Sequence, residues 1–239
     1  MRIVSLVPSQ TELLFDLGLG DRIVGVTKFC VHPEHARKTR LVIGGTKKFD
    51  IDRIASLKPD LIIGNKEENY EEGIDYLRQR YPVWMSDILT LEDALGMIKS
   101  VALLTGTELK GHALVREINE SFAGPPAFSN TRAIYLMWYN PWMGAASGTF
   151  ISHIMERVGL SNVLAHRERY PELVQYEITD LKPDLVLLSS EPFPFKEKHE
   201  QEIRHLLPKA KIMQVDGEMF SWYGSRLRMA PAYFNSLAY

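Results

Sequence analysis

The apolar positions of this chain fall into short blocks, and the blocks repeat in its two halves. Residues 2–6 and 132–136 are apolar runs that predict strands, and each precedes a loop and an amphipathic helix that ends near a glycine. The runs LIIG at 61–64 and LVLL at 185–188 show no polar alternation. Such runs are typical of strands buried on both faces, as in parallel sheets covered by helices.

The pentapeptide LKPDL occurs twice, at 57–61 and at 181–185. In each copy an acidic residue opens a short helix, which the proline ends because it disfavours helical geometry in the residue before it. Strand-like runs at 81–87 and 210–216 complete each half. The order strand, helix, short helix, strand, strand therefore occurs twice, and it predicts two α/β lobes with mainly parallel sheets.

A helical connector is predicted between the two halves. Apolar residues recur at helical spacing from Leu91, and Thr107 is a suitable N-cap for a second helix. We expect an N-terminal lobe at 1–104, a rigid linker helix within 105–126 and a C-terminal lobe at 127–239. Clefts between lobes are preferred ligand sites, although an old duplication with an empty cleft would give the same architecture.

Composition and charge exclude several classes of function. The chain has 239 residues, 45% of them hydrophobic, and its net charge of −2 provides no basic field for nucleic acid. No run approaches the roughly 18 apolar residues of a membrane span, and Cys30 stands alone. The first apolar run stops at Pro8 and is too short for a secretory signal. We therefore expect a cytoplasmic protein, or an exported one whose leader was removed.

Neither catalytic residues nor a cofactor are predicted. The glycine-bearing segments GGTKK and GAASGTF match neither a phosphate-binding loop nor a nucleophile elbow. Cys30, His32 and His35 are potential metal ligands that lie close together in sequence. Surface or helix-capping roles suit the seven histidines better, so no metal site is predicted.

Longer motifs resemble a known family. RIVSLVPSQTELLFDLGLGDRIVGVT, followed by FDIDRIASLKPDLIIG, resembles the helical-backbone substrate-binding proteins of bacterial ABC importers. NPWMGAASGTFISHIMERVGLSNV and DGEMFSWYGSRLRMAP fit the same family, so the resemblance covers nearly the whole chain. It implies two Rossmann-like lobes joined by a long rigid helix, with cobalamin, a ferric siderophore or haem in the cleft. The cobalamin-binding branch is the most similar.

The resemblance also implies positions that bind the ligand. Phe29 matches an aromatic residue that lies against the corrin, whereas Lys47 and Lys48 replace an aromatic residue and Asn65 replaces a tryptophan. These departures put a close copy of the cobalamin site in doubt. Aromatic residues in loops favour a flat ligand over a role in the core. The ligand-binding candidates of the second half are Tyr139, Trp142, Glu218, Phe220, Trp222 and Tyr223.

Two acidic residues are candidates for docking to a partner. In the family, an acid from each lobe binds arginines of the membrane permease, and the matching residues here are Asp52 and Glu177. An acid in the first helical turn also stabilises its own helix by about 0.3–1 kcal/mol, which alone would account for both. Arg226 either holds an anionic ligand group or ties its own loop down.

Together these features predict a monomeric solute-binding protein of an ABC importer that binds a cobalamin-like corrinoid and delivers it to a permease. The resemblance implies a periplasmic or cell-surface location. An iron-siderophore or haem receptor of the same fold is the first alternative, favoured by Lys47, Lys48 and Arg226 if they face an anionic ligand. A leaderless cytoplasmic protein that handles tetrapyrroles is the second, and a scaffold with an empty cleft is the third.

Overall fold

The structure, a computed structural model, describes residues 1–238, and its contacts divide the chain into two units. Unit 1 comprises Met1–Ile88, Glu92–Asn119 and Tyr223–Arg228. Unit 2 comprises Leu89–Leu91, Glu120–Trp222 and the rest of the described chain from Met229. Most of the predicted linker helix is thus part of unit 1, and a short segment near the C-terminus returns to that unit.

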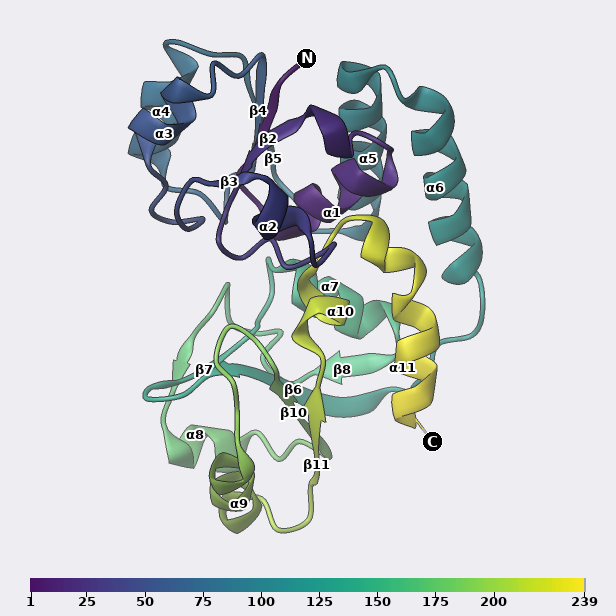
Figure 1. The fold of residues 1–239 in the computed structure, drawn as a ribbon. Helices are drawn as coiled ribbons and strands as arrows, with labels where there is room; N and C mark the ends of the chain where they lie inside the picture. The colour runs from purple at the N-terminus through teal and green to yellow at the C-terminus, as the bar shows by residue number, and fades with distance from the viewer. Residues whose placement is uncertain (239) are drawn as a thin grey trace. The chain divides into compact units, whose positions relative to one another are not determined.

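Unit 1 is built on a five-stranded parallel sheet, in the order β3-β2-β1-β4-β5. Figure 1 shows α3 and α4 on one side of this sheet and α1, α5 and α6 on the other. Burial on both faces explains the continuous apolar runs, since every residue of β4 is buried. The elements are β1 (Ile3–Ser5), α1 (Pro8–Asp16), β2 (Ile23–Val26), α2 (Ala36–Thr39), β3 (Leu41–Val42), α3 (Ile51–Ser56), β4 (Leu61–Asn65), α4 (Glu71–Arg78), β5 (Val83–Ser86), α5 (Leu91–Thr105), α6 (Glu108–Ser121) and the short 3₁₀ helices η1 (Gly20–Arg22) and η2 (Ser225–Arg228).

Unit 2 repeats this plan with one change. Its main sheet has the order β11-β10-β6-β7-β9, and β8 also pairs with β6. The pairs among β6, β8, β10 and β11 are parallel, whereas β7 runs antiparallel to β6 and β9. The elements are β6 (Thr131–Trp138), β7 (Trp142–Gly144), α7 (Phe150–Arg157), β8 (Leu160–Asn162), β9 (Glu172–Leu173), α8 (Gln175–Asp180), β10 (Leu185–Ser189), α9 (Glu197–Leu206), β11 (Lys211–Val215), α10 (Gly217–Ser221) and α11 (Ala230–Ala238). The predicted α/β fold with mainly parallel sheets is confirmed.

Both copies of LKPDL form the same connection between a helix and a buried strand. The residue before each proline, Lys58 or Lys182, has a left-handed backbone, with φ of 45° and 46°. Such a residue ends the helix and turns the chain, and the proline then prevents the helix from continuing. The strand that follows is β4 in the first copy, where it pairs with β1, and β10 in the second copy, where it pairs with β6.

An arginine at the start of the neighbouring strand, β1 or β6, stabilises each of these turns. Arg2 Nε donates a hydrogen bond to the carbonyl oxygen of Leu57 at 2.7 Å, and Arg132 Nη2 donates to that of Leu181 at 2.6 Å. These carbonyl groups lie at helix C-termini, where they lack partners within the helix. The sequence repeat therefore encodes a strand–turn contact as well as a helix stop.

The segment between the two halves forms two helices, α5 and α6. The 14 residues of α6 rise about 21 Å at 1.5 Å per residue. Gly111 of α6 lies directly against α5, because an added Cβ would come 2.4 Å from the Cβ of Ala102. Close contact of this kind joins the two helices without a flexible tether.

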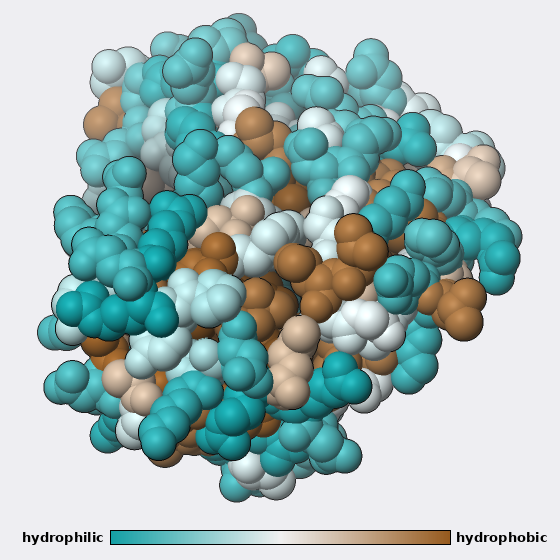
Figure 2. Space-filling model, turned by 90° about the horizontal axis from the view of Figure 1, so that it is seen from above, coloured by the Kyte–Doolittle hydropathy of each residue, from teal (hydrophilic) through white to brown (hydrophobic). Residues whose placement is uncertain are grey.

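The face shown in Figure 2 is largely hydrophilic, with hydrophobic side chains gathered near its middle. Exposed leucines of the α5–α6 hairpin include Leu103 and Leu109. No helix within residues 1–238 combines the length and the hydropathy that a membrane crossing requires.

Candidate functional site

Loops that follow parallel strands are the natural place for a binding site in both units. Open α/β sheets bind ligands beyond the carboxyl ends of their strands. In unit 1 the loops after β2, β3 and β4 contain the predicted residues Phe29, Lys47 and Asn65. In unit 2 Tyr139 follows β6 and Trp142 begins β7, whereas the candidates after β11 lie in α10 or directly after it.

Phe29 is presented to solvent by the loop after β2. Its side chain is 48% exposed, which is unusual for a phenylalanine, and the ammonium group of Lys28 lies 4.9 Å from the centre of its ring. Lys28 N–H donates to the carbonyl oxygen of Gly44 at 2.8 Å, so this loop is bound to the loop after β3. Phe29 is therefore available as an aromatic platform.

The predicted Lys47 lies at the tip of a hairpin formed by residues 44–49. The N–H of Gly45 donates to the carbonyl oxygen of Lys48 at 2.9 Å, which closes the tip. Lys47 Nζ donates to the backbone carbonyl oxygen of Glu67. Lys47 thus ties the loop after β3 to the loop after β4.

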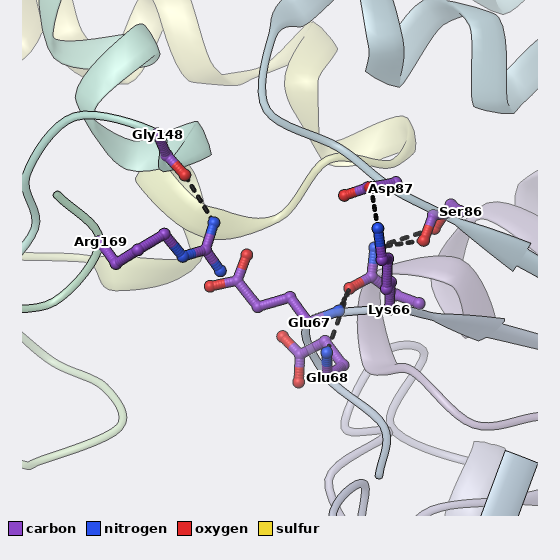
Figure 3. Close-up of polar contacts among 8 residues, drawn as sticks. Lys66, Glu67, Glu68, Ser86, Asp87, Gly148 and Arg169 are labelled. Atoms are coloured by element: carbon purple, nitrogen blue, oxygen red, sulfur yellow. Dashed lines mark hydrogen bonds and ion pairs between the residues drawn. The ribbon is translucent and has the colours of Figure 1, made fainter. Parts of the chain in front are cut away.

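Asn65 holds the loop after β4 from the inside. It is buried, its Nδ2 donates to Ser86 Oγ at 3.0 Å, and its Oδ1 accepts the N–H groups of Glu67 and Glu68 at 2.8 and 3.1 Å. Figure 3 shows Glu67, Glu68 and Ser86 around this position, beside the ion pair between Lys66 Nζ and Asp87 Oδ2, at 2.9 Å. These hydrogen bonds are made within unit 1, so the Asn65 side chain shapes the loop after β4.

In unit 2 the predicted Tyr139 and Trp142 meet in an aromatic cluster. Their ring centres are 4.8 Å apart in an edge-to-face arrangement, which suits the aromatic quadrupoles. Trp142 is stacked on Phe195 at 5.8 Å, and Phe193 lies 5.7 Å from the exposed Trp138. Trp142 and Phe195 are buried in the hydrophobic core of unit 2, whereas Tyr139 and Phe193 are partly buried against that core and Trp138 is exposed.

Phe193, Phe195 and His199, which complete this cluster, were not among the predicted site residues. His199 is buried, and its ring lies 4.6 Å from Tyr139 and 5.1 Å from Phe193. The signal in the sequence was the motif EPFPFK at 191–196, in which two aromatic residues and two prolines follow a buried strand. A hollow of about 360 Å³, lined in part by Phe195 and Asp216, opens beside them.

The candidates after β11 lie deeper than their loop position indicated. Phe220 is fully buried, with its ring 5.2 Å from Tyr135 and 4.8 Å from Phe234, so it packs in the core of unit 2. Tyr223 is also buried, and it belongs to unit 1. Glu218 is half-buried on α10.

Trp222 is oriented by Glu191, a residue that sequence reasoning did not single out. Glu191 Oε1 accepts hydrogen bonds from Trp222 Nε1 and from Ser221 Oγ, each at 3.0 Å. Burial raises the pKa of the Glu191 carboxyl group above its usual range, and the nearby acids Glu218 and Asp216 raise it further. The buried indole is thus held by a carboxyl group in a locally acidic part of unit 2.

The two predicted docking acids differ in their surroundings. Asp52 is exposed in the first turn of α3, whose N-cap is Asp50. Glu177 pairs with Arg167, and its Oε2 accepts the N–H of Val174 at 2.9 Å. The hydrogen bond from Arg167 holds the pKa of Glu177 below its usual range. Glu177 therefore stabilises the start of α8, whereas the Asp52 carboxylate faces solvent.

His199 should make stability depend on pH. Its Nδ1 accepts the N–H of Lys196 at 2.9 Å, and burial lowers its pKa, an effect that the charge of Lys198 reinforces and that of Glu202 opposes. The unfolded chain therefore binds this proton at a higher pH than the folded protein. The contribution of His199 to the free energy of unfolding is fully present above the unfolded pKa of about 6.5. It declines as pH falls below that value, by at most about 1.4 kcal/mol per pH unit.

The matched variant is His199→Gln, because glutamine closes a capping box without titrating. Urea unfolding of both proteins between pH 7.5 and 5.5 measures the difference in slope. Equal slopes for the two proteins would contradict the role given to His199.

Several known proteins are similar to this chain in sequence. The profile of the periplasmic binding protein family matches residues 3–206. A vitamin B12-binding protein from Vibrio parahaemolyticus is 26% identical over 194 residues, covering 79% of this chain and 70% of that protein. The vitamin B12-binding protein of Yersinia pestis is also 26% identical, covering 79% and 69%. These relatives are binding proteins rather than enzymes.

Solved structures share the fold along the whole chain. The periplasmic vitamin B12-binding protein of Vibrio cholerae superposes with a TM-score of 0.81 at 20% identity, covering 99% of this chain and 96% of that one. The periplasmic haem-binding protein of the same organism gives a TM-score of 0.79 at 22% identity, covering 100% and 99%. With its two α/β units and a family profile that spans most of its length, this chain belongs to the periplasmic binding protein family.

Proposed function

We propose that this protein binds a cobalamin-like corrinoid for an ABC importer and works in the periplasm or at the cell surface. The observation that carries the proposal is the placement of aromatic side chains at strand ends. Phe29 is exposed beyond the parallel sheet of unit 1, and the partly buried Tyr139 and the exposed Trp138 lie at the end of β6 in unit 2. Flat, largely apolar ligands bind to such surfaces through ring contacts. The vitamin B12-binding relatives support the choice of ligand.

A haem or a ferric siderophore is the second candidate ligand. Haem-binding proteins are among the solved structures with this fold. Lys28, whose ammonium group lies 4.9 Å from the centre of the Phe29 ring, and the exposed Lys47 and Lys48 also favour a ligand with acidic groups. Arg226 does not add to this argument, because both of its hydrogen bonds to Glu12 hold it inside unit 1.

A titration of the ligand-stripped protein tests the function. We expect saturable one-to-one binding of cyanocobalamin, followed by absorbance and calorimetry, with haemin and a ferric siderophore as the other ligands. Phe29→Ala should weaken binding by about tenfold, since an aromatic contact of this kind contributes about 0.5–1.5 kcal/mol beyond its buried area. Leu109→Ala, which removes another exposed apolar side chain from unit 1, is the control.

Each outcome of the titration assigns the ligand. If haemin or the siderophore binds and cyanocobalamin does not, the second candidate ligand replaces the corrinoid. If none of the three ligands binds, the proposed function is refuted.

For delivery, we propose that Asp52 and Glu177 face the permease. The exposed carboxylate of Asp52 supports this role more directly than that of Glu177, which already binds Arg167. Asp52→Lys should then lower ligand uptake by permease-containing vesicles and leave ligand affinity unchanged. If uptake is unchanged, Asp52 does not dock to the permease and serves only as an acidic residue in the first turn of α3.

A further inference from the structure

A second hollow in unit 2 lies away from the loops that follow its strands. It has a volume of about 280 Å³, and its walls come from the segment between α6 and β6, the end of α7, and α11. Ala127 and Val158, which line it, precede the parallel strands β6 and β8, and α11 lies beside this end of the unit in Figure 1. The eight residues of β6 span about 26 Å at about 3.3 Å each, so Tyr139 lies at the other end of the sheet.

The walls of this hollow are rigid and largely apolar. Pro125, Pro126 and Pro231 have backbone φ angles that their own rings fix. Phe234 is fully buried, with its ring 4.8 Å from that of Phe220 in the core. A site whose walls are already in place loses little conformational freedom when a ligand binds. The hollow, called the proline hollow below, is defined by Pro125, Pro126, Arg157, Pro231, Phe234 and Asn235.

Backbone hydrogen bonds hold the proline-containing segment against the end of α7. Phe128 N–H donates to the carbonyl oxygen of Val158 at 2.9 Å, and Thr131 N–H donates to that of Gly159 at 3.3 Å. An added Cβ on Gly159 would lie 1.9 Å from the carbonyl oxygen of Phe128 and 3.1 Å from Pro126 Cβ. The floor of the proline hollow therefore depends on a close backbone contact that glycine allows.

Arg157, in the last turn of α7, is the one charged residue among the described residues that line the proline hollow. Its side chain is exposed, and within residues 1–238 it forms neither an ion pair nor a hydrogen bond. Asn235 of α11 lines the same hollow and can donate from its amide. A guanidinium group suits a carboxylate, which it can bind through two parallel N–H groups.

We propose that the proline hollow binds a small aromatic carboxylate, with the ring between the prolines and Phe234 and the carboxylate on Arg157. A cavity of about 150 Å³ can hold benzene. The proline hollow, at about 280 Å³, has room for one ring with a short acidic arm. This site goes beyond the proposed corrinoid-binding function, which uses the loops after the strands, and it does not depend on that function.

Two probes of nearly the same size but different charge test the proposal. 4-Fluorophenylacetate has a carboxylate, and 4-fluorophenylacetamide has a neutral amide in its place. Each is titrated into the full protein to millimolar concentration, while its fluorine NMR signal is followed. We expect saturable binding of the acid, at least about fivefold tighter than that of the amide, because charge-assisted hydrogen bonds are stronger than neutral ones. The difference should shrink at high salt, since Arg157 is exposed.

Four variants locate the binding site. Arg157→Gln should remove the preference for the acid, whereas Lys209→Gln, which removes an exposed positive charge elsewhere in unit 2, should keep it. Asn235→Phe places a ring at the proline hollow and should weaken the binding of both probes. Phe29→Ala, in the loops of unit 1, should change neither affinity. Thermal unfolding of each variant checks that the fold is retained.

The outcomes decide whether the proline hollow is a carboxylate site. Equal affinity for the two probes, a preference that survives Arg157→Gln, or no binding of the acid would overturn the proposal. Loss of binding in the Phe29 variant would place the probe in the loops of unit 1 and would overturn it as well. None of these measurements uses cyanocobalamin, so the inference and the proposed function stand or fail separately.

Discussion

Replacing Arg226 with methionine is expected to lower the free energy of unfolding by about 3 kcal/mol. Arg226 donates from Nε and Nη2 to the two carboxylate oxygens of Glu12, at 3.1 and 2.8 Å, and the side chains are only 9% and 15% exposed. Removing one partner of a buried pair leaves the other charge without compensation, which costs about 3–5 kcal/mol. Burial already raises the pKa of Glu12, although Arg226 opposes this shift.

Two further variants make the test specific. The double replacement of Glu12 and Arg226 by methionine should recover most of the loss, because apolar residues can replace a buried pair at little cost. Arg228→Met is the control, since its pair with Asp16 at 3.3 Å is about one-third exposed and should contribute no more than about 1 kcal/mol. Urea denaturation measures all of them. Equal stability of the Arg226 and Arg228 variants would show that burial of the first pair carries no special weight.

Gly159→Ala should destabilise unit 2 by at least about 3 kcal/mol, through backbone strain and overpacking together. Gly159 has φ of +86°, a conformation that alanine rarely adopts. An added Cβ would also lie 1.9 Å from the carbonyl oxygen of Phe128, and the neighbouring hydrogen bond from Phe128 N–H to Val158 holds that backbone in place. The added Cβ clashes with the backbone of Phe128 rather than with a flexible side chain, so no change of rotamer can relieve the clash.

Gly96→Ala is the matched control for this substitution. Gly96 lies within α5, and an added Cβ there meets nothing within 4 Å. Alanine should stabilise that helix by up to about 1 kcal/mol. Thermal unfolding of the two variants should therefore shift in opposite directions, and a Gly159 variant as stable as the parent would refute the steric argument.

The predictable part of the fold is the part that depends on local pattern. The strands at 61–64 and 185–188 were evident because burial on both faces demands continuous apolar residues, and they became β4 and β10. The turns of LKPDL were evident because proline restricts the residue before it. What the pattern did not reveal was the left-handed backbone of Lys58 and Lys182, the same in both copies.

Short strands escaped prediction for a physical reason. The strands β7 and β9 have three and two residues, and they run antiparallel at the end of the sheet in unit 2. A segment of two or three residues cannot show a period, so only its pairing partners define it. These two strands were therefore not predicted, although the second sheet is mainly parallel as expected.

The candidate site was predicted less fully than the fold. Phe29 and Tyr139 could be chosen from their loops, but the enclosure of Phe220 by Tyr135 and Phe234 depends on contacts that sequence spacing does not contain. Asn65 was chosen by analogy with a ligand residue, although its amide holds two backbone N–H groups of its own loop. Loop position indicates where a ligand can bind, whereas burial decides which side chains reach it.

The return of Tyr223–Arg228 to unit 1 has a consequence for synthesis on the ribosome. The strands of the first sheet all lie before residue 87, yet the arginine that neutralises Glu12 follows it by 214 positions. A nascent chain can therefore pair those strands early, whereas the Glu12 carboxylate gains its counter-ion only after Arg226 has emerged. Folding of unit 1 is therefore completed only after Arg226 has been synthesised, and a gene fragment encoding the first half alone would leave that acid without this arginine.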